Sequence, residues 1–145
     1  MKNTESQIIN SSKGFTIIQL IIWAVVVSVV VGGFFYLLNS ERSKTRDAKR
    51  MSDMTRVQAA FELLYSTTAS YSAAAEGCYE EETLVSTCAL STQLPDISII
   101  RDPGNFLYTV TKVPDDEGYE VTFELERSYG NLQAGVHTVT QSGIR

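Results

Sequence analysis

Two cysteines are the first residues of this chain whose chemistry depends on their spacing. Cys78 and Cys88 lie ten positions apart in a stretch rich in Gly, Ser, Thr and Glu, and the sequence has no other cysteine. A disulfide between them would stabilise the fold by about 3 kcal/mol and would persist only in an oxidising compartment. The alternative is a pair of free thiols. Two cysteines and one distant histidine are too few ligands for a zinc site.

Carboxylates near two turn signals form the second candidate site. Asp115, Asp116 and Glu117 are consecutive in a turn, and Asp102 opens an earlier Asp-Pro-Gly-Asn turn. Calcium takes several oxygen ligands, so these four residues are candidate calcium ligands. Their spacing is not that of an EF-hand loop, and acidic turns are in most cases simply solvated. A calcium site and a solvated acidic surface therefore both remain open.

Residues for catalysis are not evident in the sequence. His137, the only histidine, lies in a predicted strand with no serine or cysteine nucleophile motif beside it. No Gly-rich phosphate loop or metal motif occurs. The chain has 12 basic and 17 acidic residues, a balance that does not indicate a nucleic-acid partner. We expect a protein that is not an enzyme and that needs no cofactor, apart from the calcium considered above.

The dominant element is an apolar run from Phe15 to Leu38. It has 24 residues without a charge. As a helix it extends about 36 Å, enough to cross a hydrocarbon core about 30 Å thick. A secretory signal peptide has a shorter apolar core and a small-residue cleavage site after it, and the residues following Leu38 make a poor site. We expect a membrane span that is retained.

The residues on either side of the span give opposite indications of its orientation. Lys2 and Lys13 precede it, whereas five basic residues follow it closely: Arg42, Lys44, Arg46, Lys49 and Arg50. The positive-inside rule alone would place the C-terminal domain in the cytoplasm, whereas a disulfide would place it in an oxidising compartment. A basic cluster in this position is most often a solvated helix face or a contact to lipid headgroups.

The helix is expected to continue beyond the membrane, because no Gly or Pro interrupts residues 36–65. Apolar residues recur there at helical spacing on one face: Met51, Met54, Val57, Phe61, Leu64 and Tyr65. Charged residues are expected mostly on other faces: Arg50, Asp53, Arg56 and Glu62. Together with the span this predicts one helix of about 50 residues. Its aqueous half needs a partner that covers the apolar stripe.

The C-terminal part of the chain predicts that partner. Residues 66–105 lack sustained periodicity and are expected to form a long loop. Strands are expected at 106–113, 119–127 and 136–140, the second with clean apolar and polar alternation. The fold class is therefore α+β, with a long N-terminal helix packed on a three- or four-stranded antiparallel sheet.

Three stretches of the chain resemble one family. KGFTIIQL at Lys13–Leu20, followed directly by the apolar run, resembles the class III signal of type IV pilins and the related pseudopilins of type II secretion. Residues 46–73 resemble the helix that follows the membrane in that family. RDPGNFLYTVT at residues 101–111 resembles the Asp-Pro-containing start of its sheet.

The resemblance implies processing and a domain organisation. A prepilin peptidase would cut between Gly14 and Phe15, and Phe15 would then be N-methylated. Residues 1–14 would be the leader, 15–38 the transmembrane and filament-core helix, and 39–145 a pilin-like domain that includes the amphipathic part of the helix. The family places this domain outside the cytoplasmic membrane, in agreement with the cysteines. The basic cluster after the span is then a departure from the charge rule.

Gln19 is a departure from the family pattern. Most members carry glutamate at this fifth mature position, where a buried carboxylate can pair with the α-amino group of a neighbouring subunit. Glutamine can accept a hydrogen bond from that group but cannot neutralise it. The residue is therefore compatible with a minor or tip subunit, with a filament subunit that tolerates glutamine, or with a merely tolerated polar side chain.

The resemblance implies a structural subunit of a type IV pilus or a type II secretion pseudopilus that polymerises through its N-terminal helix. Its partners would be other pilin or pseudopilin subunits, the prepilin peptidase, the inner-membrane assembly platform and, before assembly, membrane lipid. Some pseudopilins bind calcium in the part of the fold that contains the acidic turn. The alternative is a membrane-anchored binding module outside the cytoplasm that does not polymerise.

Overall fold

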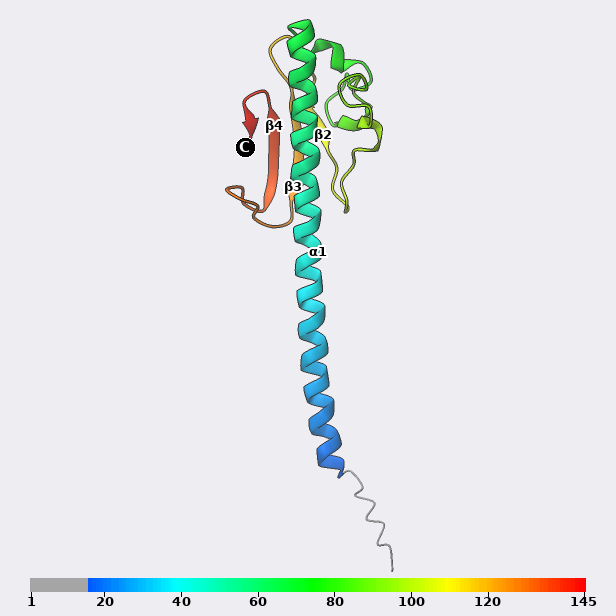
Figure 1. Cartoon of the computed structure of the whole chain (residues 1–145), viewed down its shortest axis with the longest axis vertical. Coiled ribbons are helices and arrows are strands. Elements are labelled where there is room, and N and C mark those ends of the chain that lie inside the picture. Colours follow the sequence, from blue (N-terminus) through cyan, green and yellow to red (C-terminus); the bar gives the residue numbers. More distant parts are fainter. Residues whose placement is uncertain (1–15) are drawn as a thin grey trace, which may run out of the picture. The chain divides into compact units, whose positions relative to one another are not determined.

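The computed structural model describes residues 16–145, so the predicted cleavage at Gly14 and methylation at Phe15 lie outside the described residues. One helix, α1, runs without interruption from Ile17 to Thr68 (Figure 1). Its 52 residues confirm the prediction that the apolar run continues into the amphipathic stretch. By contacts between residues, the chain divides after Leu38 into two units.

Helix α1 ends where the sequence stops favouring a helix. Ser66, Thr67 and Thr68 turn their hydroxyl groups back onto backbone carbonyls of the preceding turn. Side chains of this kind compete with the backbone and are weak helix formers. Ala69 then adopts a left-handed conformation with φ of 57°, which directs the chain away from the helix axis.

The sheet of the second unit has five antiparallel strands in sequential order: β1 (Thr83–Leu84), β2 (Thr109–Lys112), β3 (Glu120–Leu125), β4 (Gly135–Thr140) and β5 (Gly143–Ile144). The three predicted strands are confirmed as β2, β3 and β4, with β2 shorter than expected. Tyr108 instead accepts a hydrogen bond from Val85 through its carbonyl, and the amide of Phe106 donates to Asp102. The two edge strands were not predicted, since two residues cannot show alternation.

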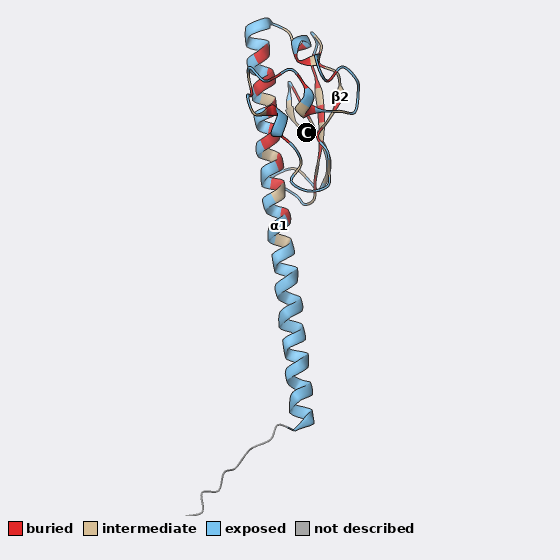
Figure 2. Ribbon diagram, turned by 90° about the vertical axis from the view of Figure 1, so that its right-hand side faces the viewer, coloured by how far each residue is buried: buried red, intermediate tan, exposed pale blue. Residues whose placement is uncertain are grey.

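The core lies between the sheet and the residues of α1 that follow Asn39. Helix residues Met54, Val57, Phe61 and Leu64 are buried, and Figure 2 shows the buried positions along one side of this part of α1. The sheet contributes its own buried residues: Val110, Val121, Phe123, Leu125 and Val139. The rings of Phe61 and Tyr119 stack with centroids 3.8 Å apart. This confirms that the sheet covers the apolar stripe of the helix.

The predicted composition of the stripe is wrong at its margins. Tyr65 is 42% exposed and Met51 only half-buried, whereas Arg50 and Asp53 are fully buried on the side of the helix that faces the core. In the first turns of the buried face, charged residues occupy the positions that apolar residues occupy later. They are tolerated there because they pair with charged groups in the rest of the unit.

The connection between α1 and β2 is an ordered segment closed by a disulfide. Cys78 and Cys88 are bonded, with Cα atoms 4.8 Å apart, which confirms the predicted pairing. Three short 3₁₀ helices follow its course, at Ser72–Ala75, Val85–Thr87 and Ile97–Ile99. The segment adds buried apolar residues to the core: Val85, Leu90, Leu94, Ile97 and Ile100. Gly77 is required, because a Cβ there would lie 2.2 Å from the carbonyl oxygen of Thr87.

Replacing Phe61 by alanine tests the contact between helix and sheet. The side chain is fully buried, so we expect Phe61→Ala to lower the free energy of unfolding by about 3–5 kcal/mol. Leu63→Ala is the control, since Leu63 is 51% exposed on the same helix and its loss costs about 0.5 kcal/mol or less. Urea unfolding of the detergent-solubilised chain measures both. Equal effects of the two changes would contradict the packing described here.

Candidate functional site

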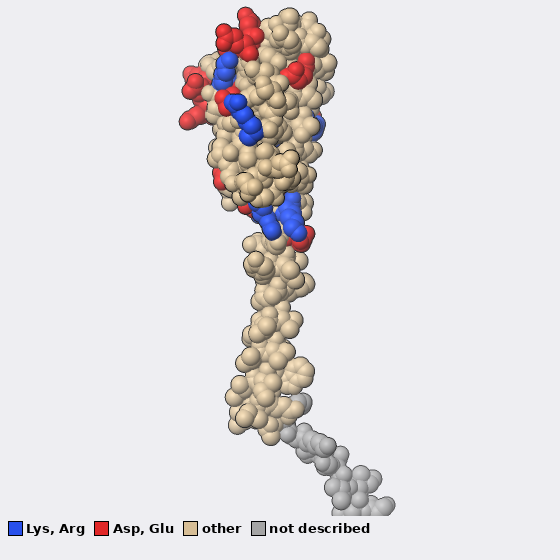
Figure 3. Space-filling view, turned by 90° about the vertical axis from the view of Figure 1, so that its left-hand side faces the viewer, with Lys and Arg blue, Asp and Glu red and all other residues tan. Residues whose placement is uncertain are grey.

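The first candidate surface is the apolar part of α1. Every described residue from Thr16 to Leu38 is exposed within the chain. In Figure 3 this segment shows no Lys, Arg, Asp or Glu, whereas charged side chains gather on the second unit. By length and composition, α1 is the one helix among residues 16–145 that could cross a membrane. An apolar surface of this size is found where a protein contacts lipid or other proteins.

Gln19 lies in the first turn of this segment. Its backbone amide donates to the carbonyl of Thr16 at 3.0 Å, and its side chain is exposed without a hydrogen bond to another described residue. Ser28, by contrast, satisfies its hydroxyl on the carbonyl of Ala24 at 2.8 Å. The amide side chain of Gln19 is therefore presented outward to whatever surrounds the helix.

The second candidate site is a buried ion-pair cluster around Arg50. Its guanidinium group is fully buried and forms a fork with Asp102, through Nε at 2.5 Å and Nη2 at 3.0 Å. Its Nη1 donates to both Asp47 and Glu126, each at 2.7 Å. Arg46 also pairs with Glu126. The cluster joins helix α1 to the loop before β2 and to the residue after β3.

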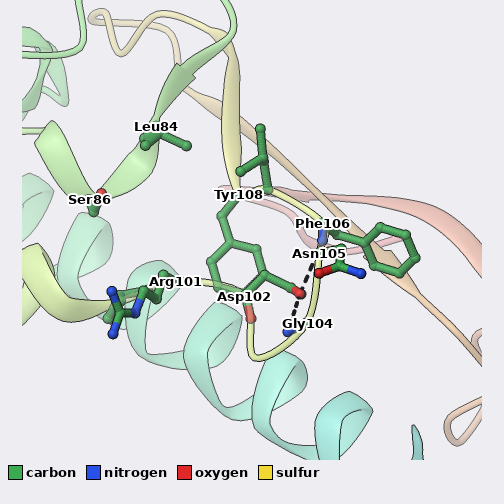
Figure 4. A pocket seen from close by; sticks show the side chains of 10 residues that line it. Leu84, Ser86, Arg101, Asp102, Gly104, Asn105, Phe106 and Tyr108 are labelled. Atoms are coloured by element: carbon green, nitrogen blue, oxygen red, sulfur yellow. Dashed lines mark hydrogen bonds between the residues drawn. The ribbon is translucent and has the colours of Figure 1, made fainter.

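Backbone amides complete the cluster. Asp47 accepts hydrogen bonds from the amides of Glu126 and Arg127 at 3.0 and 2.9 Å. Asp102 accepts from the amides of Gly104 and Phe106 at 2.7 and 3.2 Å, drawn as dashed lines in Figure 4. Buried charges are tolerated only when they are paired and hydrogen-bonded, and each carboxylate here has both kinds of partner.

The close packing extends to the faces of the guanidinium group of Arg50. The ring of Phe106 lies 4.8 Å from the guanidinium carbon, in cation–π geometry. The backbone of Gly104 also packs closely against the guanidinium group. A Cβ at this position would lie 3.0 Å from Nη2 of Arg50. The Asp102–Phe106 turn thus encloses the arginine on more than one side.

The cluster shifts the pKa of its members. Burial alone would lower the pKa of Arg50, but the hydrogen bonds to Asp102, Asp47 and Glu126 outweigh it and raise the value. The hydrogen bond from Arg46 and the contact with Arg50 lower the pKa of Glu126 to about 2, against the effect of burial. Burial opposes ionisation of Asp102, and Arg50 nevertheless lowers its pKa. The raised pKa of Arg50 and the lowered pKa values of Glu126 and Asp102 all favour the charged forms.

The spacing of charged residues along α1 could have predicted this cluster, although a search for apolar periodicity alone passes over it. Asp47 and Arg50 precede Met54 and Val57 at spacings of three and four, so they continue the buried face of the helix toward the membrane. Asp53 is buried nearby, where it accepts from Lys49 at 2.7 Å and from the hydroxyl of Tyr108 at 3.3 Å. Charges in the register of an apolar stripe indicate a buried ion pair.

The four predicted calcium ligands do not lie together. Asp102 is held by Arg50, whereas Asp115–Glu117 form the turn between β2 and β3, beside the C-terminal end of α1. In that turn Asp115 accepts from the amides of Glu117 and Gly118, both at 2.8 Å. Within residues 16–145, no group of three or more His, Cys, Asp or Glu side chains is arranged to hold a metal ion. Calcium binding by the acidic turn stays a prediction, and Asp102 is bound by Arg50 and lies apart from that turn.

A surface pocket of about 310 Å³ adjoins the Asp102 turn (Figure 4). Its lining is mainly apolar and includes Leu84, Ile100, Phe106 and Leu107, with Arg101 at one side. Asp102 reaches the pocket but is occupied by Arg50. The exposed apolar side chains of the lining are features of a contact surface.

Replacing Arg50 tests the cluster. Arg50→Met leaves Asp47 and Asp102 buried without their cation, so we expect a loss of about 3–5 kcal/mol in the free energy of unfolding. Arg56→Met is a matched control on the same helix, because its pair with Asp96 is exposed and worth about 0–1 kcal/mol. Urea unfolding at neutral pH distinguishes the two, and similar losses would show that the cluster is not a main support of the fold.

The lowered pKa of Glu126 makes stability depend on pH. The value is about 2 in the folded chain against an ordinary 4.5, so its contribution is present above about pH 4.5 and is lost as the pH falls toward 2. Glu126→Gln should remove part of this slope, whereas Glu124→Gln, two residues earlier and outside the cluster, should keep it. The free energy of unfolding between pH 7 and about 2.5 measures the slope. An unchanged slope in Glu126→Gln would contradict the assignment.

The arrangement is pilin-like in its architecture: a long apolar N-terminal helix packs on an antiparallel sheet, and a disulfide closes the connecting segment. The apolar residues 17–38 form the candidate contact surface, and the Arg50 cluster fixes the helix to the rest of the second unit. Comparison of the chain with models of known protein families, with curated proteins and with solved structures finds no match.

Proposed function

We propose that this chain is a structural subunit of a type IV pilus or of a type II secretion pseudopilus. The observation that carries the proposal is the division of α1 into two parts. Residues 17–38 expose an unbroken apolar surface, whereas the later turns of the same helix are bound into a folded α+β unit. A subunit anchored in lipid and later packed among copies of itself needs this combination.

The apolar segment requires an environment that buries it, and the proposal supplies two in succession. Before assembly the segment crosses the cytoplasmic membrane, where the helix satisfies its own backbone hydrogen bonds. After assembly the same surface packs against the helices of neighbouring subunits. The disulfide between Cys78 and Cys88 supports an extracytoplasmic location for the second unit, because such bonds persist in oxidising compartments.

Processing follows from the sequence before the helix. The KGFTIIQL stretch supports a cut by a prepilin peptidase between Gly14 and Phe15, followed by N-methylation of Phe15. The mature chain would then enter the helix almost at its first residue, since α1 begins at Ile17. Assembly would further require the inner-membrane platform.

Gln19 supports a minor or tip subunit within this function. Its outward-facing amide can accept a hydrogen bond from the α-amino group of another subunit but carries no charge to neutralise it. A subunit at the tip of a filament has no further subunit beyond it to dock, so the loss of the carboxylate is tolerated there.

A second candidate function is a membrane-anchored binding module that does not polymerise. The apolar pocket beside Arg101, with Leu84 and Leu107 exposed at its lining, favours this alternative. In that case the leader would not be removed and residues 17–38 would serve only as an anchor. The state of the N-terminus separates the two functions.

The test is the mass of the protein isolated from its own cells. We expect a chain that begins at Phe15 and carries one additional methyl group. Gly14→Val should block the cut, keep the chain in the membrane and abolish its incorporation into filaments. Gly33→Val is the matched control, because it changes the same residue type within the apolar segment and should be cut normally.

Two results would contradict the proposal. A native chain that still begins at Met1, in cells whose peptidase processes other prepilins, would favour the anchored module. Normal incorporation of uncut Gly14→Val into filaments would show that the predicted cleavage site is not used.

A further inference from the structure

The basic residues that follow the apolar segment are not used by the proposed function, and the structure divides them into two groups. Arg46, Lys49 and Arg50 are paired with carboxylates of the second unit: Glu126, Asp53, Asp47 and Asp102. These charges stabilise the fold. A second group lies closer to the apolar segment and has a different set of contacts.

The second group consists of Arg42, Lys44 and Arg127, which we call the basic collar. All three are exposed. Arg42 and Arg127 form no salt bridge with a carboxylate within residues 16–145. Lys44 forms an exposed salt bridge with Glu41 at 2.7 Å on the helix surface. Three cations thus face solvent with one carboxylate among them. Figure 3 shows basic side chains, with an acidic one beside them, at the end of this unit where the chain enters it.

Arg127 belongs to the collar because of the fold. It lies 87 positions after Ser40, and its Nη1 donates to both the hydroxyl and the carbonyl of that residue. Its backbone amide is fixed by Asp47 at 2.9 Å. The end of β3 therefore delivers a third cation to the same turns of α1 that carry Arg42 and Lys44. This grouping is not apparent from the order of residues in the chain.

The distance along α1 gives the level of the collar in a membrane. Ser40, Arg42 and Lys44 follow Leu38 by two, four and six residues, which correspond to about 3, 6 and 9 Å of helix. The headgroup layer on each side of a bilayer is about 5–7 Å thick. When residues 17–38 occupy the hydrocarbon core, Arg42 and the Ser40 contact of Arg127 lie within the headgroup layer. Lys44 lies just beyond it, with the layer in reach of its long side chain.

We infer that the basic collar is a binding site for the phosphate groups of anionic phospholipids, in the leaflet on the side of the second unit. Guanidinium groups match phosphate oxygens in a planar, bidentate arrangement, and Lys44 adds a point charge. The inference rests on the membrane span of the proposed function and not on polymerisation.

A second copy of the chain is the competing occupant. The distal acidic turn at Asp116 and Glu117 could in principle meet the collar of another subunit. The lipid is favoured because the collar follows the apolar segment within two turns, so an anchored chain has phosphates beside it at any protein concentration. The competing occupant would require contact between copies, and the experiment separates the two on this basis.

The experiment measures which lipid lies beside the end of the apolar segment. The full chain carries Trp23→Phe and Tyr36→Trp, which leaves a single tryptophan six residues before Arg42. It is placed in nanodiscs at one chain per disc, with equal parts of phosphatidylglycerol and phosphatidylcholine. Two sets of nanodiscs are compared. In one set phosphatidylglycerol carries brominated acyl chains, and in the other set phosphatidylcholine carries them. Quenching of the tryptophan reports the lipid in contact with the helix.

With the collar intact, we expect phosphatidylglycerol to be preferred by at least about threefold. Arg42→Gln/Arg127→Gln should bring this ratio close to one, and high salt should reduce it in the parent chain. Arg56→Gln/Arg145→Gln is the matched control. It removes the same charge from exposed positions outside the collar and should keep the preference.

Three results would overturn the inference, each in a different way. Equal quenching by both lipids in the parent chain would show a span without a phosphate site, leaving the proposed function intact. A preference that is lost when several chains share a disc would assign the collar to a second copy, whose acidic turn displaces the phosphates. Absence of quenching by either lipid would show that residues 17–38 do not span the bilayer, and the membrane span would fail with the inference.

Discussion

The fold of the second unit depends on the neutralisation of one buried arginine. Arg50 lies on the helix, and its carboxylate partners come from the same helix, from the loop before β2 and from the end of β3. A buried cation without these partners would be strongly unfavourable, so the three segments can adopt their places only together. The cluster thereby fixes the rotation of the helix about its axis more strictly than apolar packing can, because methyl groups tolerate sliding and a guanidinium fork does not.

The same helix serves two environments, and the transition between them is built from polar residues. The apolar segment ends at Leu38, cations and hydroxyl groups occupy the next turns, and the apolar core contact begins at Met54. Of the charges in between, Arg46, Lys49 and Arg50 serve the fold. Arg42 and Lys44 remain at the surface. The basic cluster of the sequence therefore divides into a group that is paired within the fold and a group that stays at the surface.

The sequence predicted those parts of the fold that follow a strict period. The helical spacing of Met54, Val57, Phe61 and Leu64 and the alternation in β3 leave only one way to form a common core, and the cysteine pair was recognisable from its spacing. The Arg50 cluster was not predicted, because its partners lie 52 and 76 positions away and charged residues normally avoid an apolar face. The pairing of Asp102 with Arg50 was not predicted for the same reason, since a carboxylate in a turn does not show which cation it meets. The edge strands β1 and β5 are too short to carry any pattern.

The order of elements along the chain has a consequence for biogenesis. The helix emerges first and ends at Thr68, whereas β3, which helps to cover its amphipathic face, ends only at Leu125. In the extracytoplasmic orientation proposed above, this face would stay uncovered until β3 has crossed the membrane, and the Arg50 cluster could not close before Glu126 follows. In that orientation the folding delay would be set by translocation of the C-terminal half, and a truncated chain that ends before β3 would remain as an anchored, unfolded stub for quality-control proteases to remove.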